Sequence, residues 1–338
     1  MKNLIECPYC EGQAELLKEL KELNYRKEIF KVMAHFYKCA KCQEEFTTTE
    51  TDTITLLQAH NQYREKHSIP LVEEIISIRE KYDLSASKMS DVLALGTNGY
   101  SNYERGEMPS PAIGNLIYTA DNPAVFKTML EKVRQSFTDL KYQATINKIK
   151  YLLDEQKEGN YNQIKLNQYN EANSFTGFKK INKEKLAQLL IAFITKCNIK
   201  FNDRLKLNKL LFYSDFLSYK LSGFSITGLT YRAIQYGPVP TFYDNIYAYL
   251  ENEALIFSNW NRDENGAAKE CFITDQVFNY NLFDNCEQQT IELVTEKFKD
   301  ISTWDLVDLS HKEKSWIELH SLKGIINYQD YAFYLKGA

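Results

Sequence analysis

Apolar residues recur at helical spacing through the middle of the chain. Leu71, Ile75 and Ile78 fit one face of a helix, and two shorter helical segments follow at 85–93 and 98–105. A spacing of three to four residues places such side chains on one side of a helix, where they can pack together. This part of the chain is therefore predicted to be a compact all-helical unit.

Glycine and proline mark where these helices are expected to end and begin. Gly96 is predicted to end the first short helix, and Gly106 the second. Pro109 and Pro111 flank Ser110, which is predicted to cap a further helix with Pro111 in its first position.

The beginning of the chain has a different pattern. Residues 35–38 alternate between apolar and polar as strands do, and residues 46–49 also predict a strand. Residues 53–69 have the pattern of a helical connector that ends before Pro70, because the residue before a proline disfavours helix.

The last part of the chain is predicted to be mostly helical with a small β element. Residues 158–180 precede it; they are poor in aliphatic side chains and predict a linker after a charged helical stretch at 136–157. A glycine- and proline-rich region at 223–240 predicts loops and strands. Helices are expected at about 186–194, 205–221, 287–299 and 303–309 and near the C-terminus, and a strand at 271–274.

Composition limits the classes of protein that the chain can belong to. A length of 338 residues allows two or three domains, and a net charge of −4 gives no overall affinity for polyanions. No apolar segment of a signal peptide precedes Cys7, and no run approaches the length of about 18 apolar residues that a membrane span needs. We therefore expect a cytoplasmic protein without membrane contact.

Two C-x-x-C pairs are the most specific chemical signal in the sequence. They are Cys7 with Cys10 and Cys39 with Cys42, separated by 28 residues, which predicts a long hairpin or a helix between them. Two such turns complete a tetrahedral four-sulfur shell for zinc, which leaves no open position and is therefore structural. Free or redox-active thiols are the alternative. His35 is interpreted as a strand residue because four sulfurs already fill the shell.

The two short helices around Gly96 predict a helix-turn-helix. In this motif the second helix enters the major groove of DNA, and its first residues contact base edges. Ser87 and Lys88 are better placed for phosphates, and Arg105 either caps its helix or contacts phosphate. The residues expected within reach of bases are Thr97, Asn98, Tyr100, Ser101 and Asn102. A helical bundle with a fortuitous turn is the alternative.

The segment Ser101-Asn102-Tyr103-Glu104-Arg105-Gly106 resembles the helix-turn-helix family with an S-x-Y-E-x-G signature. Together with the four cysteines, it resembles the MqsA group of antitoxins over residues 1 to about 135. The resemblance implies operator reading by an Asn and by an Arg four residues later; Asn98 matches the first, but Asn102 replaces the Arg, so a different operator sequence is expected. It also implies a homodimer on palindromic double-stranded DNA and autorepression.

The charge of the helix-turn-helix region argues against strong non-specific DNA binding. Residues 71–135 contain seven Lys and Arg against nine Asp and Glu, a net charge of −2. Because affinity for DNA backbone depends on counterion release by basic side chains, binding must rely on dimerisation and local placement.

Three C-terminal segments occur in an order that resembles the SocA-like Panacea domain. They are a K-L-x-K-L-L-x-Y helix at 206–213, a Tyr-Gly-Pro-Val turn at 236–239 with Pro240 behind it, and an L-S-H-x-x-x-x-W segment at 309–316. The resemblance covers residues 181 to about 335. It implies a mostly helical domain that neutralises a toxin by direct binding, but it does not name the toxin.

The aromatic residues of this region offer a partner surface or a core. Tyrosine suits interfaces because it is both apolar and hydrogen-bonding, so part of the 231–243 segment is expected to face a partner or regulator. The candidate partner-binding residues are Tyr213, Tyr231, Arg232, Tyr236 and Tyr243. Cys197, Cys271 and Cys286 are interpreted as buried small hydrophobes.

An enzymatic role is the weakest hypothesis. His311 with Glu313, or Asp215 with Asp244, can be drawn as acid–base pairs. No nucleophile elbow, phosphate loop or further metal cluster accompanies them, so we expect no catalysis. His311 is instead interpreted as bracing the fold, and Asp215 as solvated or hydrogen-bonded.

The sequence thus predicts a mainly α, multidomain protein with a small zinc-bound α+β head, a helix-turn-helix bundle and a mostly helical C-terminal domain with a small antiparallel β element. The function expected is that of an antitoxin that binds a cognate toxin and represses its own operon. A zinc-containing regulator whose C-terminal domain senses a ligand or phage product is the alternative. The predicted domains are 1–52 (zinc-binding head), 53–70 (connector), 71–135 (helix-turn-helix), 136–180 (helical and polar linker) and 181–338 (toxin-neutralising domain).

Overall fold

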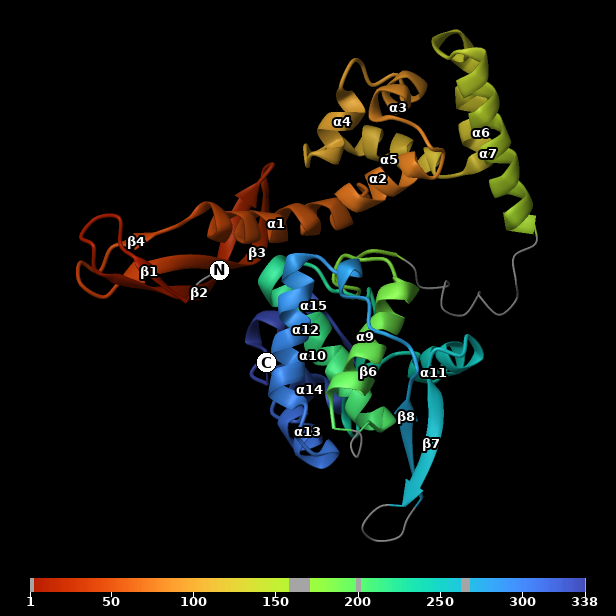
Figure 1. Ribbon diagram of the computed structural model, residues 1–338. Helices are drawn as coiled ribbons and strands as arrows, with labels where there is room; N and C mark the ends of the chain where they lie inside the picture. Colours follow the sequence, from red (N-terminus) through yellow and green to blue (C-terminus); the bar gives the residue numbers. More distant parts are fainter. Residues whose placement is uncertain (1–2, 158–170, 199–201, 263–267, 338) are drawn as a thin grey trace. The chain divides into compact units, whose positions relative to one another are not determined.

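The computed structural model describes residues 3–157, 171–198, 202–262 and 268–337. The chain divides into two compact units, one formed by residues 1–59 with 165–338 and the other by residues 60–164 (Figure 1). The structure is mainly helical with small antiparallel sheets, as the sequence predicted. Most of the expected linker at 158–180 lies outside the described residues. No helix in the described ranges has the length and apolar composition needed to cross a membrane.

The N-terminal head is a four-stranded antiparallel sheet in the order β1-β2-β3-β4. A hairpin, and not a helix, separates the two cysteine pairs, which settles the alternative left open by the sequence. Its turn uses Arg26 and Lys27, which both have positive φ, as the two-residue turns that match strand twist require. The strands are β1 (Leu4–Glu6), β2 (Gln13–Tyr25), β3 (Glu28–Cys39) and β4 (Glu45–Phe46).

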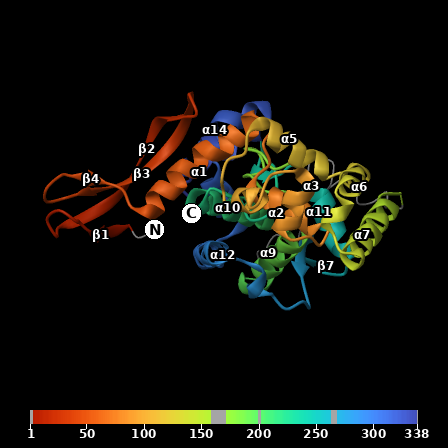
Figure 2. The same cartoon turned by 90° about the horizontal axis from the view of Figure 1, so that it is seen from above.

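Helix α1 (Thr49–Lys66) follows the sheet and runs beside the hairpin (Figure 2). The strand expected at 46–49 is therefore shorter than predicted, because only Phe46 of these residues belongs to a strand. The reason is a local competition for hydrogen bonds: Thr48 and Thr51 each accept the other's backbone N–H on the side-chain oxygen, at 2.8 and 3.3 Å. Such reciprocal bonds favour the start of a helix over a continued strand.

In the described part of the second unit, residues 60–157, all regular structure is helical. Its core contains Ile75, Met89, Tyr100 and Phe126, all fully buried. The helices in it are α2 (Val72–Glu80), α3 (Ala86–Leu93), α4 (Gly99–Glu104), α5 (Pro111–Ala120), α6 (Pro123–Lys132), η1 (Arg134–Ser136) and α7 (Asp139–Lys157).

The ends of these helices confirm one cap prediction and correct another. Ser110 accepts the N–H of Ile113 on its side chain, with Pro111 in the first helical position as predicted. Helix α3, however, ends at Leu93, and its left-handed cap is Ala94 and not Gly96. Gly96 also has positive φ but lies two residues farther on, in the turn itself.

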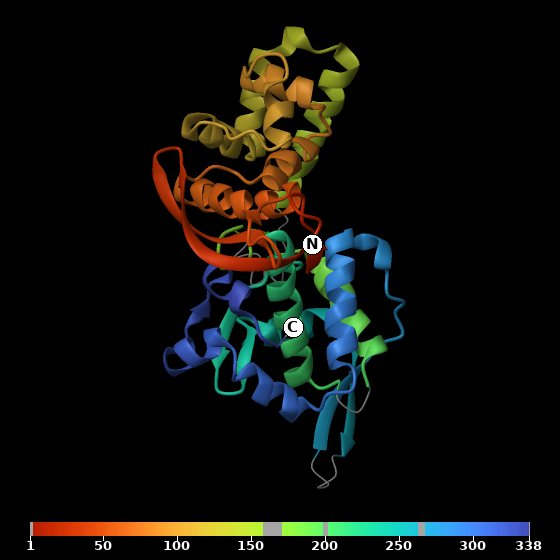
Figure 3. The ribbon, with the colours of Figure 1, turned by 90° about the vertical axis from the view of Figure 1, so that its left-hand side faces the viewer.

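The C-terminal domain is built around α10 (Arg204–Ser222), which runs through its middle (Figure 3). Side chains on all sides of this helix are buried from Lys206 to Tyr219, so it carries no exposed polar face there. The other helices are α9 (Lys183–Lys196), α11 (Tyr243–Asn252), η3 (Tyr280–Leu282), α12 (Asn285–Phe298), α13 (Thr303–Ser310), α14 (Lys314–Leu319), η4 (His320–Leu322), α15 (Tyr328–Tyr331) and η5 (Ala332–Tyr334).

Two small antiparallel sheets complete this domain. One has the strand order β6-β5-β9, and the other pairs β7 with β8. The predicted helices at 287–299 and 303–309 are confirmed, with ends that differ by no more than two residues. The predicted strand at 271–274 is also confirmed, although it begins three residues earlier, at Ala268. The strands are β5 (Tyr231–Ile234), β6 (Gly237–Pro240), β7 (Phe257–Arg262), β8 (Ala268–Ile273) and β9 (Ile325–Ile326).

Candidate metal centre and nucleic-acid interface

The four N-terminal cysteines meet at the base of the β2–β3 hairpin. Their sulfur atoms all lie within 4.8 Å of one another, with Cys7 Sγ 3.7 Å from Cys42 Sγ and Cys10 Sγ 3.4 Å from Cys39 Sγ. Four thiolates placed tetrahedrally at about 2.3 Å from zinc would be about 3.8 Å apart. The cluster therefore has the donor set and the spacing to hold a metal ion.

Backbone groups support this cluster. The N–H groups of Cys42 and Lys41 point at Cys39 Sγ, at 3.5 and 3.3 Å, and lower the pKa of the Cys39 thiol to about 6. Gly12 lies so close that a Cβ there would be 3.3 Å from both Cys10 Sγ and Cys39 Sγ. The backbone thus favours the thiolate form of Cys39, and little space is left beside the sulfur atoms.

His35 does not belong to the cluster. It lies within β3 as predicted, is buried, and its Nδ1 is 2.9 Å from the backbone oxygen of Met33. The potential ligands in the described chain are the four sulfurs alone. A shell of four sulfurs has no position for water or substrate, so a metal there would serve structure.

Helices α3 and α4 form the predicted helix-turn-helix. Thr97 and Asn98 are exposed between the two helices, and Ser101 and Asn102 are half-buried on α4. The side chain of Asn98 makes no cap hydrogen bond to α4. Four of the five residues expected to face DNA bases are thus partly or fully accessible on one short segment.

Tyr100 differs from this expectation because it lies in the core. Its side chain is fully buried, its hydroxyl donates to the backbone oxygen of Ile75 at 2.6 Å, and its N–H donates to Ser90 Oγ at 3.0 Å. A tyrosine held in this way joins α4 to α2 and α3. Sequence alone could not separate it from its exposed neighbours, since α4 has fewer than two full turns.

The two basic residues of the candidate DNA surface are both engaged. Lys88 Nζ donates to Asp91 Oδ2 at 2.9 Å and to the backbone oxygen of Ser136 at 2.6 Å. Arg105 is exposed and donates to Asn102 Oδ1 at 2.6 Å. Ser87 is exposed at the start of α3, where a phosphate could approach it.

Glu104 has a role that the sequence analysis did not assign. Arg79 Nε on α2 donates to Glu104 Oε1 at 2.5 Å, and the same guanidinium donates to the backbone oxygen of Leu84 at 3.0 Å. Both side chains of the pair are largely buried, at 20% and 15% exposure. The acidic residue of the S-x-Y-E-x-G segment therefore fixes α4 to the rest of the unit.

In the C-terminal domain, residues from all three signature segments meet around the β5–β6 turn. Lys209 on α10 is fully buried, and its Nζ donates to the backbone oxygen of Pro238 at 2.9 Å. A Cβ on Gly237 would collide with Ser310 Oγ and would lie 2.9 Å from Lys209 Nζ. Trp316 Nε1 donates to the backbone oxygen of Ile234 at 2.8 Å.

Histidine and tryptophan rings brace the same turn. His311 stacks on Trp316 with ring centroids 3.9 Å apart, and His320 stacks on the other face at 4.1 Å. Burial lowers the pKa of His311, and the nearby Lys209 adds to this effect. Burial also lowers the pKa of Lys209 to about 7. The rings brace the fold, as expected for His311.

The acid–base pairs considered from the sequence have other partners. Asp215 is fully buried and accepts the N–H groups of Ile226 and Thr227, both at 2.8 Å, and the hydroxyl of Tyr231 at 2.7 Å. Burial raises the pKa of Asp215 to about 6, although these hydrogen bonds oppose the shift. Asp244 lies on the exposed side of α11 and forms an ion pair with Arg204 of α10.

Glu313 is likewise occupied by hydrogen bonds. It accepts the backbone N–H groups of Lys336 at 3.0 Å and Gly337 at 2.7 Å, and the hydroxyl of Tyr213 at 3.3 Å. Both proposed acids therefore hold the backbone or tyrosine hydroxyls in place. Hydrogen bonds of this kind stabilise a fold.

The candidate partner-binding residues separate into two groups. Tyr213 and Tyr231 are fully buried, so they belong to the core in this structure and not to a surface. Tyr236 is 45% exposed and lies edge-to-face with Trp304, with ring centroids 6.0 Å apart. Arg232 and Tyr243 are half-buried. Cys197 and Cys271 are buried as expected, and Cys286 is half-buried.

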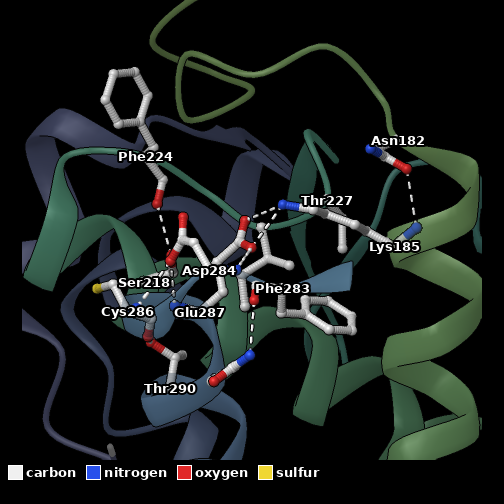
Figure 4. A network of polar contacts seen from close by, with 12 residues as sticks. Asn182, Lys185, Ser218, Phe224, Thr227, Phe283, Asp284, Cys286, Glu287 and Thr290 are labelled. Atoms are coloured by element: carbon white, nitrogen blue, oxygen red, sulfur yellow. Dashed lines mark hydrogen bonds and ion pairs between the residues drawn. The ribbon is translucent and has the colours of Figure 1, made fainter. Parts of the chain in front are cut away.

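A polar network fixes the first helix of the domain to α12 (Figure 4). Lys185 Nζ lies 2.6 Å from both carboxylate oxygens of Glu287, which is 3% exposed. Asn182 caps α9 by accepting the N–H of Lys185, and Asp284 caps α12 by accepting the N–H of Glu287, each at 2.9 Å. Charge pairing and helix caps together hold this face of the domain.

Comparison with known proteins gives two matches in separate parts of the chain. Residues 5–137 match the family model for the antitoxin component of a bacterial toxin–antitoxin system, MqsA, and residues 207–317 match that for the antitoxin SocA-like Panacea domain. The chain thus joins a region similar to MqsA to a region similar to the Panacea domain. Antitoxin MqsA of Escherichia coli (strain K12) is 27% identical over 124 residues, which cover 35% of this chain and 92% of that protein.

The matched regions coincide with the sites described above. The MqsA-like region contains the cysteine cluster and both helices of the helix-turn-helix. The Panacea-like region contains the β5–β6 turn with the residues that hold it. Both families are antitoxins of toxin–antitoxin systems, which confirms the resemblance seen in the sequence. No solved structure matches the chain.

Proposed function

We propose that this protein is an antitoxin that binds its cognate toxin through residues 181–338 and represses its own operon through residues 71–135. The observation that carries this proposal is the presence of two antitoxin-family regions in one chain. The Panacea domain would hold the toxin directly. The helix-turn-helix would bind operator DNA, and the protein would act as a homodimer on a palindromic site.

Zinc is the metal that we propose for the cysteine cluster. Four thiolates favour zinc among the common divalent ions, and strand β2 of the hairpin between the two pairs is mostly exposed. Zinc would supply folding free energy to a head that is small for an independent core. Cys7, Cys10, Cys39 and Cys42 would be its ligands and would take no part in a reaction.

The DNA-reading role falls to four residues in this proposal. Thr97, Asn98, Ser101 and Asn102 lie at or just before the start of α4, where helix-turn-helix proteins contact base edges. Asn98 is the best candidate for a bidentate contact with adenine, because its amide is exposed and makes no cap bond. Ser87, Lys88 and Arg105 would contact phosphates. Lys88 and Arg105 would first have to leave the groups that they now bond in the protein.

Toxin contact is assigned to the exposed aromatic residues near the β5–β6 turn. Tyr236 and Trp304 are 45% and 63% exposed and lie next to each other. Tyrosine and tryptophan contribute most of the binding energy at many interfaces, which supports this assignment. Arg232 and Tyr243 would contribute at the rim. Turnover is not part of the proposal, since the candidate acids Asp215 and Glu313 already hold the fold.

The proposal is tested by co-expression with the product of the adjacent open reading frame. The full chain is expected to restore growth to cells that express this product, and so is a fragment of residues 181–338. A fragment of residues 1–135 is expected to shift the promoter fragment upstream of the operon and to give no rescue. Rescue by residues 1–135 alone would refute the division of labour, and absence of both rescue and promoter binding would refute the antitoxin role.

A further inference from the structure

Helix α1 covers the open edge of strand β3. Gln58 on α1 accepts the N–H of Met33 at 2.8 Å and donates to the oxygen of Met33 at 2.9 Å. The N–H of His35 donates to Thr55 Oγ1 at 3.1 Å. Because an edge strand exposes unpaired backbone groups, these side chains take the place of a neighbouring strand.

The same glutamine extends the contact into the C-terminal domain. Gln329 Nε2 on α15 donates to Gln58 Oε1 at 2.9 Å, and Tyr219 on α10 donates its hydroxyl to Gln329 Oε1 at 2.7 Å. Gln58 is 1% exposed and Tyr219 is fully buried. Gln329 between them is half-buried. The loss of one hydrogen bond in such a series leaves a neighbouring buried polar group unpaired, which costs free energy. A continuous polar path thus joins β3 to the central helix α10.

Apolar contacts surround this path. His35 and Phe333 lie edge-to-face with centroids 5.7 Å apart, and Phe333 lies in the same way against Tyr219 at 5.9 Å. Leu57 packs so closely on Gly223 that a Cβ there would lie 3.0 Å from Leu57 Cδ2. The head and the C-terminal domain accordingly belong to one compact unit.

The metal site and this contact lie on the same strand. Strand β3 ends at Cys39, and Met33 and His35 lie four to six residues earlier on it. A two-stranded hairpin is marginally stable by itself. Metal binding at its base therefore favours the strand register that places Met33 opposite Gln58, and the contact in turn favours the metal-bound head, because such coupling is reciprocal.

We infer that metal binding at the four-cysteine site stabilises the Panacea domain through the contact of Gln58 with Gln329. The head is a metal-dependent support for the domain to which toxin binding is assigned above. This inference concerns stability within the chain, so its failure would leave the antitoxin role untouched.

The positions of the tryptophans make the inference directly measurable. The three tryptophans of the sequence are Trp260, Trp304 and Trp316, all in the C-terminal domain. Trp316 is stacked between two imidazole rings, so its fluorescence changes when the domain unfolds. Thermal unfolding of the full chain is followed by tryptophan fluorescence, with one equivalent of zinc and after treatment with EDTA. Zinc is expected to raise this melting temperature by at least about 3 °C.

Variants separate the proposed path from a general effect of zinc. Gln329→Leu is expected to keep its zinc content but to lose most of the shift in melting temperature. The matched control is Gln288→Leu, which removes an amide that donates to the backbone oxygens of Tyr280 and Phe283, far along the chain from the head. This control is expected to melt earlier with and without zinc and to keep the full shift.

Three outcomes would overturn the inference. The first is a melting temperature of the full chain that is the same with zinc and with EDTA. The second is a Gln329→Leu protein that keeps the full shift; if it does not fold, Phe333→Leu is judged by the same criterion. The third is a zinc-induced shift that persists after Cys7 and Cys42 are both replaced by serine, since the effect would then arise at another site.

Discussion

At the scale of single residues, the segment around α4 mixes exposed residues that are candidates for DNA contact with buried residues that hold the helix in place. Asn98 is exposed with an unused amide, whereas Tyr100, two residues later, is fully buried and bonded to Ile75. Glu104 lies on the same short helix and pairs with Arg79. We therefore predict that substitutions in this segment separate into those that weaken DNA binding and those that destabilise the unit.

Replacement of Asn98 by alanine tests DNA reading. Loss of a bidentate contact to adenine is expected to cost about 1–3 kcal/mol on the operator and much less on a scrambled duplex. Binding is measured by fluorescence anisotropy with both duplexes. Asn115→Ala, at an exposed position on α5, is the control and is expected to bind like the parent protein. An equal loss on both duplexes would contradict a base-reading role for Asn98.

Lys209 predicts a pH dependence of stability. Burial lowers its folded-state pKa to about 7, whereas the unfolded chain keeps the usual value near 10.4, so the unfolded state binds the extra proton between these values. The free energy of unfolding, relative to that of a Lys209→Met protein, is therefore expected to increase by about 3 kcal/mol from pH 7 to pH 9.5. The same increment is lost when the pH is lowered to 7 again. Urea unfolding of both proteins at the two pH values measures this difference. A difference that is independent of pH would show that Lys209 is charged in the folded protein.

At the scale of elements, the β5–β6 turn is held by residues from three separate segments of the chain. Gly237 has a φ of 96° and lies against Lys209 and Ser310, and Trp316 holds the end of β5. The turn itself presents Tyr236 outward. Buried signature residues thus fix the backbone, and the exposed neighbour is free to contact a partner.

Two glycine substitutions distinguish steric contact from backbone strain. Gly237→Ala introduces a side chain at positive φ and a collision, whereas Gly96→Ala introduces a side chain at a φ of 75° with open space around it. Strain alone is expected to cost about 1 kcal/mol, and the collision to add about 1–3 kcal/mol. Denaturant unfolding followed by circular dichroism measures both losses. Equal losses at the two positions would argue against close packing under the turn.

At the scale of the whole molecule, the helix-turn-helix unit offers DNA few free charges. Arg105 is an exposed basic residue close in sequence to the candidate base-contacting residues 97–102, and its guanidinium donates to the side-chain oxygen of Asn102. Six other basic residues of the unit pair with acids within it. These pairs are Arg79–Glu104, Lys81–Asp121, Lys88–Asp91, Lys127–Glu131, Arg134–Asp139 and Lys148–Asp83.

This pairing predicts a shallow salt dependence of operator binding. Each phosphate contact adds about 0.9 to the slope of log affinity against log salt, and proteins with 6–10 contacts lose about 10³–10⁵ in affinity between 50 and 200 mM salt. We expect a loss of no more than about 100-fold here, which corresponds to three or four contacts. A salt titration of binding to the promoter fragment measures the slope. A loss above 1,000-fold, on the scale of the larger sites, would show that the internal ion pairs open on DNA.

Several features followed from the sequence because they depend on local chemistry. The C-x-x-C spacing predicted that four sulfurs would meet, helical spacing around Leu71 and Ile75 predicted the bundle, and Ser110 before Pro111 predicted a cap that the structure confirms. The family resemblances rested on short motifs and are confirmed by the comparisons. The cap, the helix face and each C-x-x-C turn are readable because neighbours within a few residues set them, and a shared metal site is what two such turns predict together.

Other features were decided by contacts between distant parts of the chain. The burial of Tyr100, Tyr213 and Tyr231 depends on which helices pack on them, and a tyrosine in a short helix gives no local sign of its face. The path from Gln58 to Gln329 joins residues 271 positions apart. Only the tertiary structure brings such groups together, because the packing of a core, and not the local sequence pattern, selects which polar side chains are buried and must find partners.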